Sequence, residues 1–200
     1  MVSRIFLSLI FLVSIHSVSA QVGWELMKDK NGIKVFTSKE SSSKFKSIKV
    51  EAQLSGTLQK LLNVLLDVNN TKNWVYSTKE SYTIRKISPN EILYYNETSL
   101  PWPVSNRDVP IRMKATPDFK NNTLKVIAMG VPQAIPEKNG IVRIQQFNSS
   151  WDVKFDGKNR LSITYLLSMD PSGSISSTVT NMFMTKGPYE TFSNLADRLK

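Results

Sequence analysis

An arginine and an aspartate stand side by side at positions 107 and 108, directly after the segment PWPVSN, and Tyr95 and Glu97 precede them. A tyrosine and a carboxylate can carry out general acid–base chemistry without histidine, and an arginine can fix a polar ligand. The same residue types can instead form a buried ion pair that only holds a corner of the fold together. The proline-bracketed Trp102 could contact a membrane or fix the backbone. Residue types alone leave these interpretations open.

Other reactive residue types are scarce. The sequence has no cysteine, and its single histidine is His16, near the N-terminus. Beyond residue 20 there is therefore no thiol nucleophile, no histidine general base and no histidine metal ligand. The segment SSSK at 41–44 fits the S-x-x-K pattern but lacks its companion motifs. We expect no metal, no cofactor and no hydrolase activity.

The first twenty residues have the features of a secretory signal peptide. Arg4 precedes an apolar run over residues 5–15, and the segment ends in the small-residue sequence VSA. This pattern suits signal peptidase cleavage and is too short for a stable membrane span. We predict cleavage before Gln21 and export to the periplasm or outside the cell; the alternative is an uncleaved N-terminal anchor. The mature chain, residues 21–200, has the length of one domain.

The chain is basic. Its formal net charge is +10, and loss of Arg4 with the signal leaves +9 because no acidic residue precedes Gln21. The lysines are scattered rather than clustered, so the charge can serve solubility or a transient contact with an anionic membrane surface. We expect a monomer with no nucleic-acid partner.

Two hydrophobic periods divide the mature chain into elements. Alternation and turn signals predict strands at 33–36, 45–54, 80–88, 91–100, 107–116, 123–131, 141–155 and 160–169. Helical spacing predicts a helix at 57–68, with Thr57 as its N-cap, and a long C-terminal helix at 174–199 that Gly187-Pro188 should kink or break. This order predicts an α+β fold in which a curved antiparallel sheet is covered by the C-terminal helix.

Four segments resemble the START domain, the lipid-transfer domain of the helix-grip fold. They are GWELMKDKNGIKVFTS at 23–38, YYNE at 94–97, PWPVSNRD at 101–108 and DPSGSISSTVTNMF at 170–183. The resemblance spans residues 24–199 and implies a curved sheet that grips the C-terminal helix around a tunnel for one lipid-like molecule. It also implies that Trp102, Arg107 and Asp108 form a structural motif, in which Arg107 and Asp108 together hold the corner. A direct contact of Arg107 with the ligand is the alternative.

The chain departs from the START pattern at one position. Relatives that transfer phospholipids or sterols carry a cavity arginine six residues after the motif arginine, where this chain has Met113. Strand alternation places Val109, Ile111 and Met113 on one face and Arg112 on the other. Unless a bulge changes the register, Glu97 lacks its arginine partner and the tunnel holds less fixed positive charge. A neutral or weakly polar ligand is then favoured over a phospholipid headgroup.

Candidate ligand contacts follow from the same alternation. A few polar groups would give specificity, and inward-facing apolar side chains, including adaptable methionines, would give affinity. The candidates are Tyr95, Glu97, Val109, Ile111, Met113, Met129, Phe147, Trp151, Ile163, Tyr165, Leu167 and Met182.

The sequence therefore predicts a non-catalytic binding protein for a lipid or another hydrophobic small molecule. Two alternatives stay open. One is a cyclase- or aromatase-like enzyme of the same superfamily, with Glu97 as its candidate acid or base. The other is an envelope interaction module with a filled core.

Overall fold

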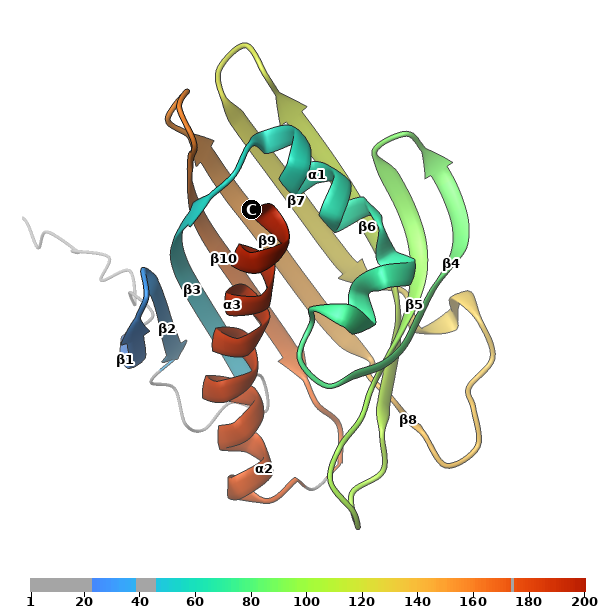
Figure 1. Cartoon of the computed structure of the whole chain (residues 1–200). Helices are drawn as coiled ribbons and strands as arrows, with labels where there is room; N and C mark the ends of the chain where they lie inside the picture. The colour runs from blue at the N-terminus through green and yellow to red at the C-terminus, as the bar shows by residue number, and fades with distance from the viewer. Residues whose placement is uncertain (1–22, 39–45, 174) are drawn as a thin grey trace, which may run out of the picture.

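Within the described part of the chain, residues 23–38, 46–173 and 175–200, the computed structural model contains one strongly curved sheet of ten strands (Figure 1). The strands are β1 Trp24–Lys30, β2 Ile33–Ser38, β3 Lys46–Ser55, β4 Thr78–Ser88, β5 Glu91–Thr98, β6 Arg107–Asp118, β7 Thr123–Gly130, β8 Val142–Arg143, β9 Gln146–Phe155 and β10 Arg160–Asp170. Their order is β1-β2-β3-β10-β9-β7-β6-β5-β4, and all neighbours along this path are antiparallel. The short strand β8 lies off the path and pairs with β6 in parallel.

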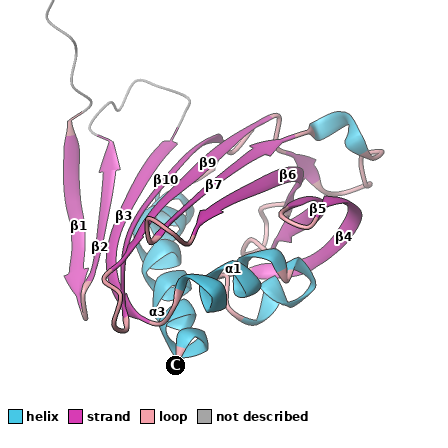
Figure 2. Ribbon diagram, turned by 90° about the horizontal axis from the view of Figure 1, so that it is seen from above, coloured by secondary structure: helices cyan, strands magenta, loops and turns pink. Residues whose placement is uncertain are grey.

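The C-terminal helix and the helix that follows β3 lie on the concave side of the sheet (Figure 2). The first, α1, spans Leu58–Leu66 and buries four leucines on one side. As predicted, the Thr57 hydroxyl caps it by accepting a hydrogen bond from the Lys60 amide at 3.2 Å. The described fold also contains two 3₁₀ turns. The first, η1 Val68–Asn73, follows α1, and the second, η2 Pro132–Ala134, precedes β8.

The C-terminal helix consists of three consecutive segments. It runs through α2 Ser177–Asn181, a π-helical turn η3 Met182–Lys186, and α3 Gly187–Leu199. The predicted break at Gly187-Pro188 is wrong, because the helix passes through the π turn and continues as α3. A side chain at Gly187 would lie 3.2 Å from the Tyr76 ring, so the glycine allows the helix to pass close to η1 and its following loop.

The predicted α+β helix-grip architecture is confirmed, with two differences in detail. The predicted strand at 141–155 is two strands, β8 and β9. Strand β1 was not predicted, because it is an edge strand whose side chains are mostly exposed and therefore show no alternation. No helix in the described ranges is long and apolar enough to span a membrane.

The hydrophobic core lies between the concave face of the sheet, α1 and α3. Its most completely buried aliphatic side chains come from all three layers: Val35, Val50, Leu61, Leu124, Val126, Leu161 and Leu195. The predicted signal peptide, residues 1–20, and the SSSK segment lie outside the described residues.

Candidate ligand-binding cavity

A cavity of about 260 Å³ lies within this core, between the sheet and the C-terminal helix. Apolar side chains of α1, η1, β6 and β9 form part of its wall, and the C-terminal helix closes it with Val179, Phe183, Met184 and Phe192. Aromatic rings join these layers, since Trp151 stacks on Phe192 at 5.2 Å and lies 4.8 Å from Tyr165 between ring centroids. The cavity is therefore bounded by the covering helix as much as by the sheet.

Five of the predicted ligand contacts line this cavity. They are Ile111, Met113, Trp151, Tyr165 and Leu167, all on strands β6, β9 and β10. Burial raises the pKa of the Tyr165 phenol to about 12, and the nearby Ser149 hydroxyl offsets part of that shift. Tyr165 is therefore a neutral hydrogen-bonding group in the wall of the cavity at physiological pH.

Five other predicted apolar contacts do not line it. Val109 and Ile163 are buried in the surrounding core, and Phe147 packs against that core. Met129 is 49% exposed, because Leu124, Val126 and Ala128 take the inward positions of β7 and Met129 falls on the opposite face. Met182 lies in the π turn but its neighbours Phe183 and Met184 line the cavity instead.

The two predicted polar contacts, Tyr95 and Glu97, also do not line the cavity. Their neighbours on β5, Tyr94, Asn96 and Thr98, line it, so Tyr95 and Glu97 point to the outer face of the sheet. The register between β5 and β6 would have identified the inward residues of β5. Asn96 pairs with Val109 and Tyr94 with Ile111, and directly opposite residues share a face of the sheet. That register is set by the loop between β5 and β6, whose conformation could not be read from the alternation of either strand.

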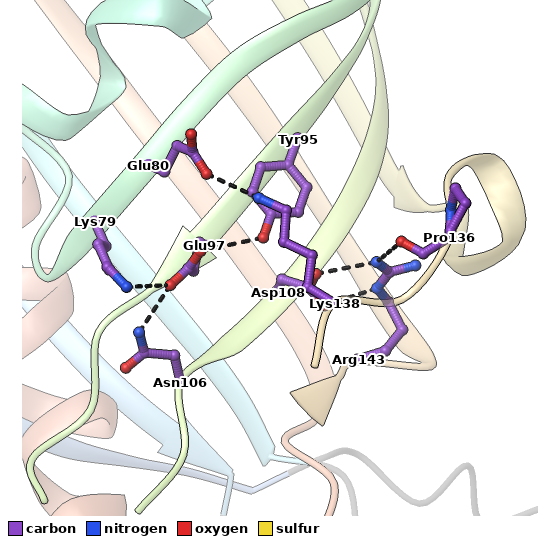
Figure 3. A network of polar contacts seen from close by, with 9 residues as sticks. All are labelled: Lys79, Glu80, Tyr95, Glu97, Asn106, Asp108, Pro136, Lys138 and Arg143. Atoms are coloured by element: carbon purple, nitrogen blue, oxygen red, sulfur yellow. Dashed lines mark hydrogen bonds and ion pairs between the residues drawn. The ribbon is translucent and has the colours of Figure 1, made fainter. Parts of the chain in front are cut away.

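On the outer face, Glu97 has a complete set of partners (Figure 3). It accepts hydrogen bonds from the Tyr95 hydroxyl at 3.2 Å and the Asn106 amide at 2.7 Å, and pairs with Lys79 at 3.0 Å. Burial would raise the pKa of Glu97, but the bonds from Lys79 and Asn106 outweigh it and hold the pKa below its ordinary value. Glu97 is therefore an ionised structural carboxylate. Because it lies outside the cavity, it does not fit the role of catalytic acid or base that the enzyme alternative assigned to it.

Residues 131–145 cover this outer face and supply the partner of Asp108. Arg143 donates two hydrogen bonds to the Asp108 carboxylate, at 2.7 and 3.0 Å, and both side chains are almost fully buried. Arg143 also donates hydrogen bonds to the carbonyls of Pro132, Ile135 and Pro136. These bonds hold residues 132–136 against the Arg143 side chain. The predicted partnership of Arg107 with Asp108 is wrong, because adjacent residues of a strand point to opposite faces.

Arg107 points to the cavity side of the same strand and lines the cavity. Its side chain is held by three carbonyl oxygens, those of Ser105 at 2.5 Å, Ser172 at 2.9 Å and Pro171 at 3.2 Å. Across the described residues no carboxylate lies within 4.0 Å of its guanidinium. Burial lowers the pKa of Arg107. The cavity therefore contains a fixed cation at Arg107 itself. The predicted reduction in positive charge concerns the position of Met113, which lines the cavity as a neutral side chain.

Arg112 lies where alternation predicted, outside the cavity, and pairs with Glu91 at 2.5 Å. The β5–β6 register is regular, so no bulge turns it inward. Trp102 does not pack as a structural residue, since its side chain is 92% exposed on the loop between β5 and β6. The base of this loop is held instead by Asn106, which accepts a hydrogen bond from the Leu100 amide at 3.2 Å.

The described residues contain no cluster of three or more histidine, cysteine or acidic side chains that could hold a metal. The features of the site are thus an apolar cavity, several neutral hydroxyl and amide groups in its wall, and one buried cation. Such a cavity, enclosed by a curved sheet and a C-terminal helix, defines a helix-grip binding protein.

Comparison with known proteins identifies the family. A model of the START domain matches residues 16–200, and the chain belongs to this family. It is 26% identical to an uncharacterized protein of Pseudomonas aeruginosa over 86% of this chain and 84% of that one. It is 30% identical to the phosphatidylcholine transfer protein of Mus musculus over 82% of this chain and 78% of that one.

A solved structure shows the same fold. The crystal structure of the STAR-related lipid transfer protein from Xanthomonas axonopodis superposes with a TM-score of 0.78 at 29% identity. The match covers 88% of this chain and 98% of that chain. Human STARD10 matches with a TM-score of 0.75 at 22% identity, covering 90% of this chain and 74% of that one.

Proposed function

We propose that this protein binds a lipid or another hydrophobic small molecule in the cavity and carries it without chemical change. The observation that carries the proposal is the apolar cavity of about 260 Å³ enclosed between the sheet and the C-terminal helix. Its membership of the START family and the names of its relatives, which include phosphatidylcholine and STAR-related lipid transfer proteins, support it. Burial of apolar ligand surface would supply affinity at roughly 25 cal/mol per Å², before ordering costs.

Ligand entry requires the C-terminal helix to move. Its first segment, Ser177–Asn181, consists of serine, threonine, valine and asparagine, which are weaker helix formers than alanine or leucine. The π turn that follows replaces the regular hydrogen-bond ladder, and its residues Phe183 and Met184 line the cavity. This half of the helix is therefore the least costly part of the wall to open.

We further propose that the mature protein is an exported monomer that makes transient contact with an anionic membrane surface. The exposed Trp102 supports this contact, because it lies on the loop whose flanking residues, Leu100 and Arg107, line the cavity. Tryptophan prefers the boundary between water and lipid. The net charge of +10 on the full chain favours anionic surfaces. The signal-like N-terminal twenty residues support export.

Native mass spectrometry tests the binding function. The mature protein, purified from a membrane-containing host without detergent, should carry a non-covalent lipid mass that organic extraction removes. Met113→Trp should abolish this mass while the protein stays folded, because the larger ring fills the cavity that Met113 lines. Met129→Trp is the matched control, since Met129 lies on the exposed face of the adjacent strand and its replacement should leave the lipid mass unchanged.

An absence of bound lipid, together with no uptake from vesicles, would reject the binding function and favour the filled-core alternative. Retention of the lipid mass in Met113→Trp would show that the ligand sits elsewhere.

A further inference from the structure

Two arginines, Arg107 and Arg143, are buried at the corner where β6 begins, and they differ in the charge of their hydrogen-bond partners. Arg143 has a full counter-ion, because the Asp108 carboxylate accepts two of its N–H groups at 2.7 and 3.0 Å. Arg107 is 5% exposed, and in the described residues its partners are three neutral carbonyl oxygens. A buried charge is costly unless an opposite charge compensates it. In the described structure the charge of Arg143 is therefore neutralised by a carboxylate of the same chain, whereas the charge of Arg107 is not.

The hydrogen bonds of Arg107 leave it able to bind an anion. A guanidinium has five N–H donors, one on Nε and two on each terminal nitrogen. Nε donates to Pro171, one terminal nitrogen to Ser105 and the other to Ser172, so within the described part of the chain each terminal nitrogen keeps one further N–H. The carbonyls also fix the plane of the group, so little side-chain entropy remains to be lost when an anion binds. A pair of N–H groups on a fixed guanidinium suits a carboxylate, which has two acceptor oxygens.

The neighbours of Arg107 in the cavity form a polar end. Thr98 lies directly opposite it on β5, and Asn96 follows on the same face; both line the cavity. Among the described residues that line the cavity, Arg107 is the single charged side chain. A head group with one negative charge would therefore balance the cavity, with hydroxyl and amide groups beside it.

The rest of the cavity is shaped for an alkyl chain. The stretch of β6 from Arg107 to Met113, whose side chains both line the cavity, is about 20 Å long at the usual rise of a strand. The cavity volume of about 260 Å³ is small for a space whose lining includes both ends of this stretch. It lies just below the roughly 300–1,000 Å³ of pockets that hold drug-sized ligands. One extended chain suits this shape better than the two chains of a phospholipid.

We propose that Arg107 binds the carboxylate of a single-chain lipid, so that the ligand of this protein is a long-chain fatty acid. This inference rests on the proposed lipid-binding function and specifies the ligand class of the same cavity. The acyl chain runs from the polar end at Arg107 and Thr98 toward Met113 and Leu65 of α1.

Titration of the mature protein with oleate and with oleyl alcohol tests the assignment, since the two differ only in the head group. The wild type should bind oleate at least about tenfold more tightly, as expected for a charge-assisted hydrogen bond. Arg107→Gln should remove this preference and leave the affinity for oleyl alcohol unchanged. Arg112→Gln is the matched control, because Arg112 lies on the opposite face of the same strand, and it should keep the preference.

The wild-type comparison decides the question even if Arg107→Gln does not fold. Equal affinities for oleate and oleyl alcohol would overturn the carboxylate assignment and leave lipid binding intact. Equal or tighter binding of lysophosphatidate than of oleate would replace the carboxylate with a phosphate. If neither oleate nor oleyl alcohol binds, the fatty-acid inference is wrong. If the purified protein also carries no lipid mass, the proposed function fails with it.

Discussion

Both faces of β5 and of the first half of β6, residues 107–111, are largely buried, but by different means. On the outer face, residues 131–145 close over a polar network in which Glu97 and the Asp108–Arg143 pair have their partners within the chain (Figure 3). On the inner face, Tyr94, Asn96 and Arg107 line a cavity. The outer face is thus completed by the protein itself, and the inner face is arranged for a molecule that the chain does not supply.

This difference gives a criterion for separating structural from functional charges in the motif. Asp108 and Arg107 are adjacent in sequence, yet the first belongs to a closed ion pair and the second faces the cavity. A charge whose counter-ion is built into the chain contributes mainly to the integrity of the fold. A buried charge that faces a cavity with only neutral partners is available to a ligand. Substitutions on the two faces should therefore affect different measurements.

The largest effect is expected on the outer face, from Asp108→Asn. Removing the carboxylate leaves Arg143 buried without its counter-ion, which should lower the free energy of unfolding by about 3–5 kcal/mol. Arg107→Gln should lower it less, by roughly 1.5–3 kcal/mol, because it removes charged hydrogen bonds to carbonyls and leaves no orphaned charge. Urea denaturation of the ligand-free variants measures both.

The order of these two losses is the informative result. Asp152→Asn is a suitable control, since its pair with Lys125 at 3.9 Å is exposed and should contribute at most about 1 kcal/mol. A greater loss from Arg107→Gln than from Asp108→Asn would show that the cavity-side arginine is the structural one, and the comparison of the two faces would be reversed.

The sequence was sufficient to predict the architecture because most elements have one buried face. The alternation on β6 placed Ile111 and Met113 inward and Arg112 outward, and the leucine spacing located α1 with its cap at Thr57. These predictions rest on hydrophobic periods that the folded chain obeys. Edge strand β1 has no such period, so hydrophobic alternation could not reveal it.

The candidate site was harder to predict because β5 is buried on both faces. Tyr95 is fully buried outside the cavity, beneath the segment that carries Lys138, whose ammonium lies 4.0 Å from the centre of the tyrosine ring. An aromatic residue and a carboxylate on a two-sided strand give no indication of which face holds the ligand. The contribution of η1 and its following loop, including Trp74 and Tyr76, also has no period to reveal it.

A smaller effect on the outer face should depend on pH. Because the pKa of folded Glu97 lies below its ordinary value of 4.5, this carboxylate stabilises the fold above that value. Its contribution is lost as the pH falls through the lowered folded-state pKa. Glu97→Gln should therefore be less stable than the wild type at neutral pH, and its stability should fall less steeply on acidification. Parallel acid-unfolding profiles for the two proteins would exclude this role of Glu97.

The smallest effect on stability is expected at the loop that joins the two faces, from Trp102→Ser. The side chain is 92% exposed, so its replacement should change the free energy of unfolding by no more than about 0.5 kcal/mol. Binding to vesicles of phosphatidylcholine and phosphatidylglycerol should nevertheless fall severalfold, because tryptophan contributes amphipathic surface at the interface.

Phe119→Ser is the matched control: Phe119 is 52% exposed just beyond the far end of β6, and its loss should leave vesicle binding unchanged. Equal losses from both variants would indicate a general hydrophobic effect. A loss confined to Trp102 would place the membrane contact at the end of the strand where Arg107 lines the cavity, so that the docking residue and the proposed head-group residue lie on the same short loop and strand end.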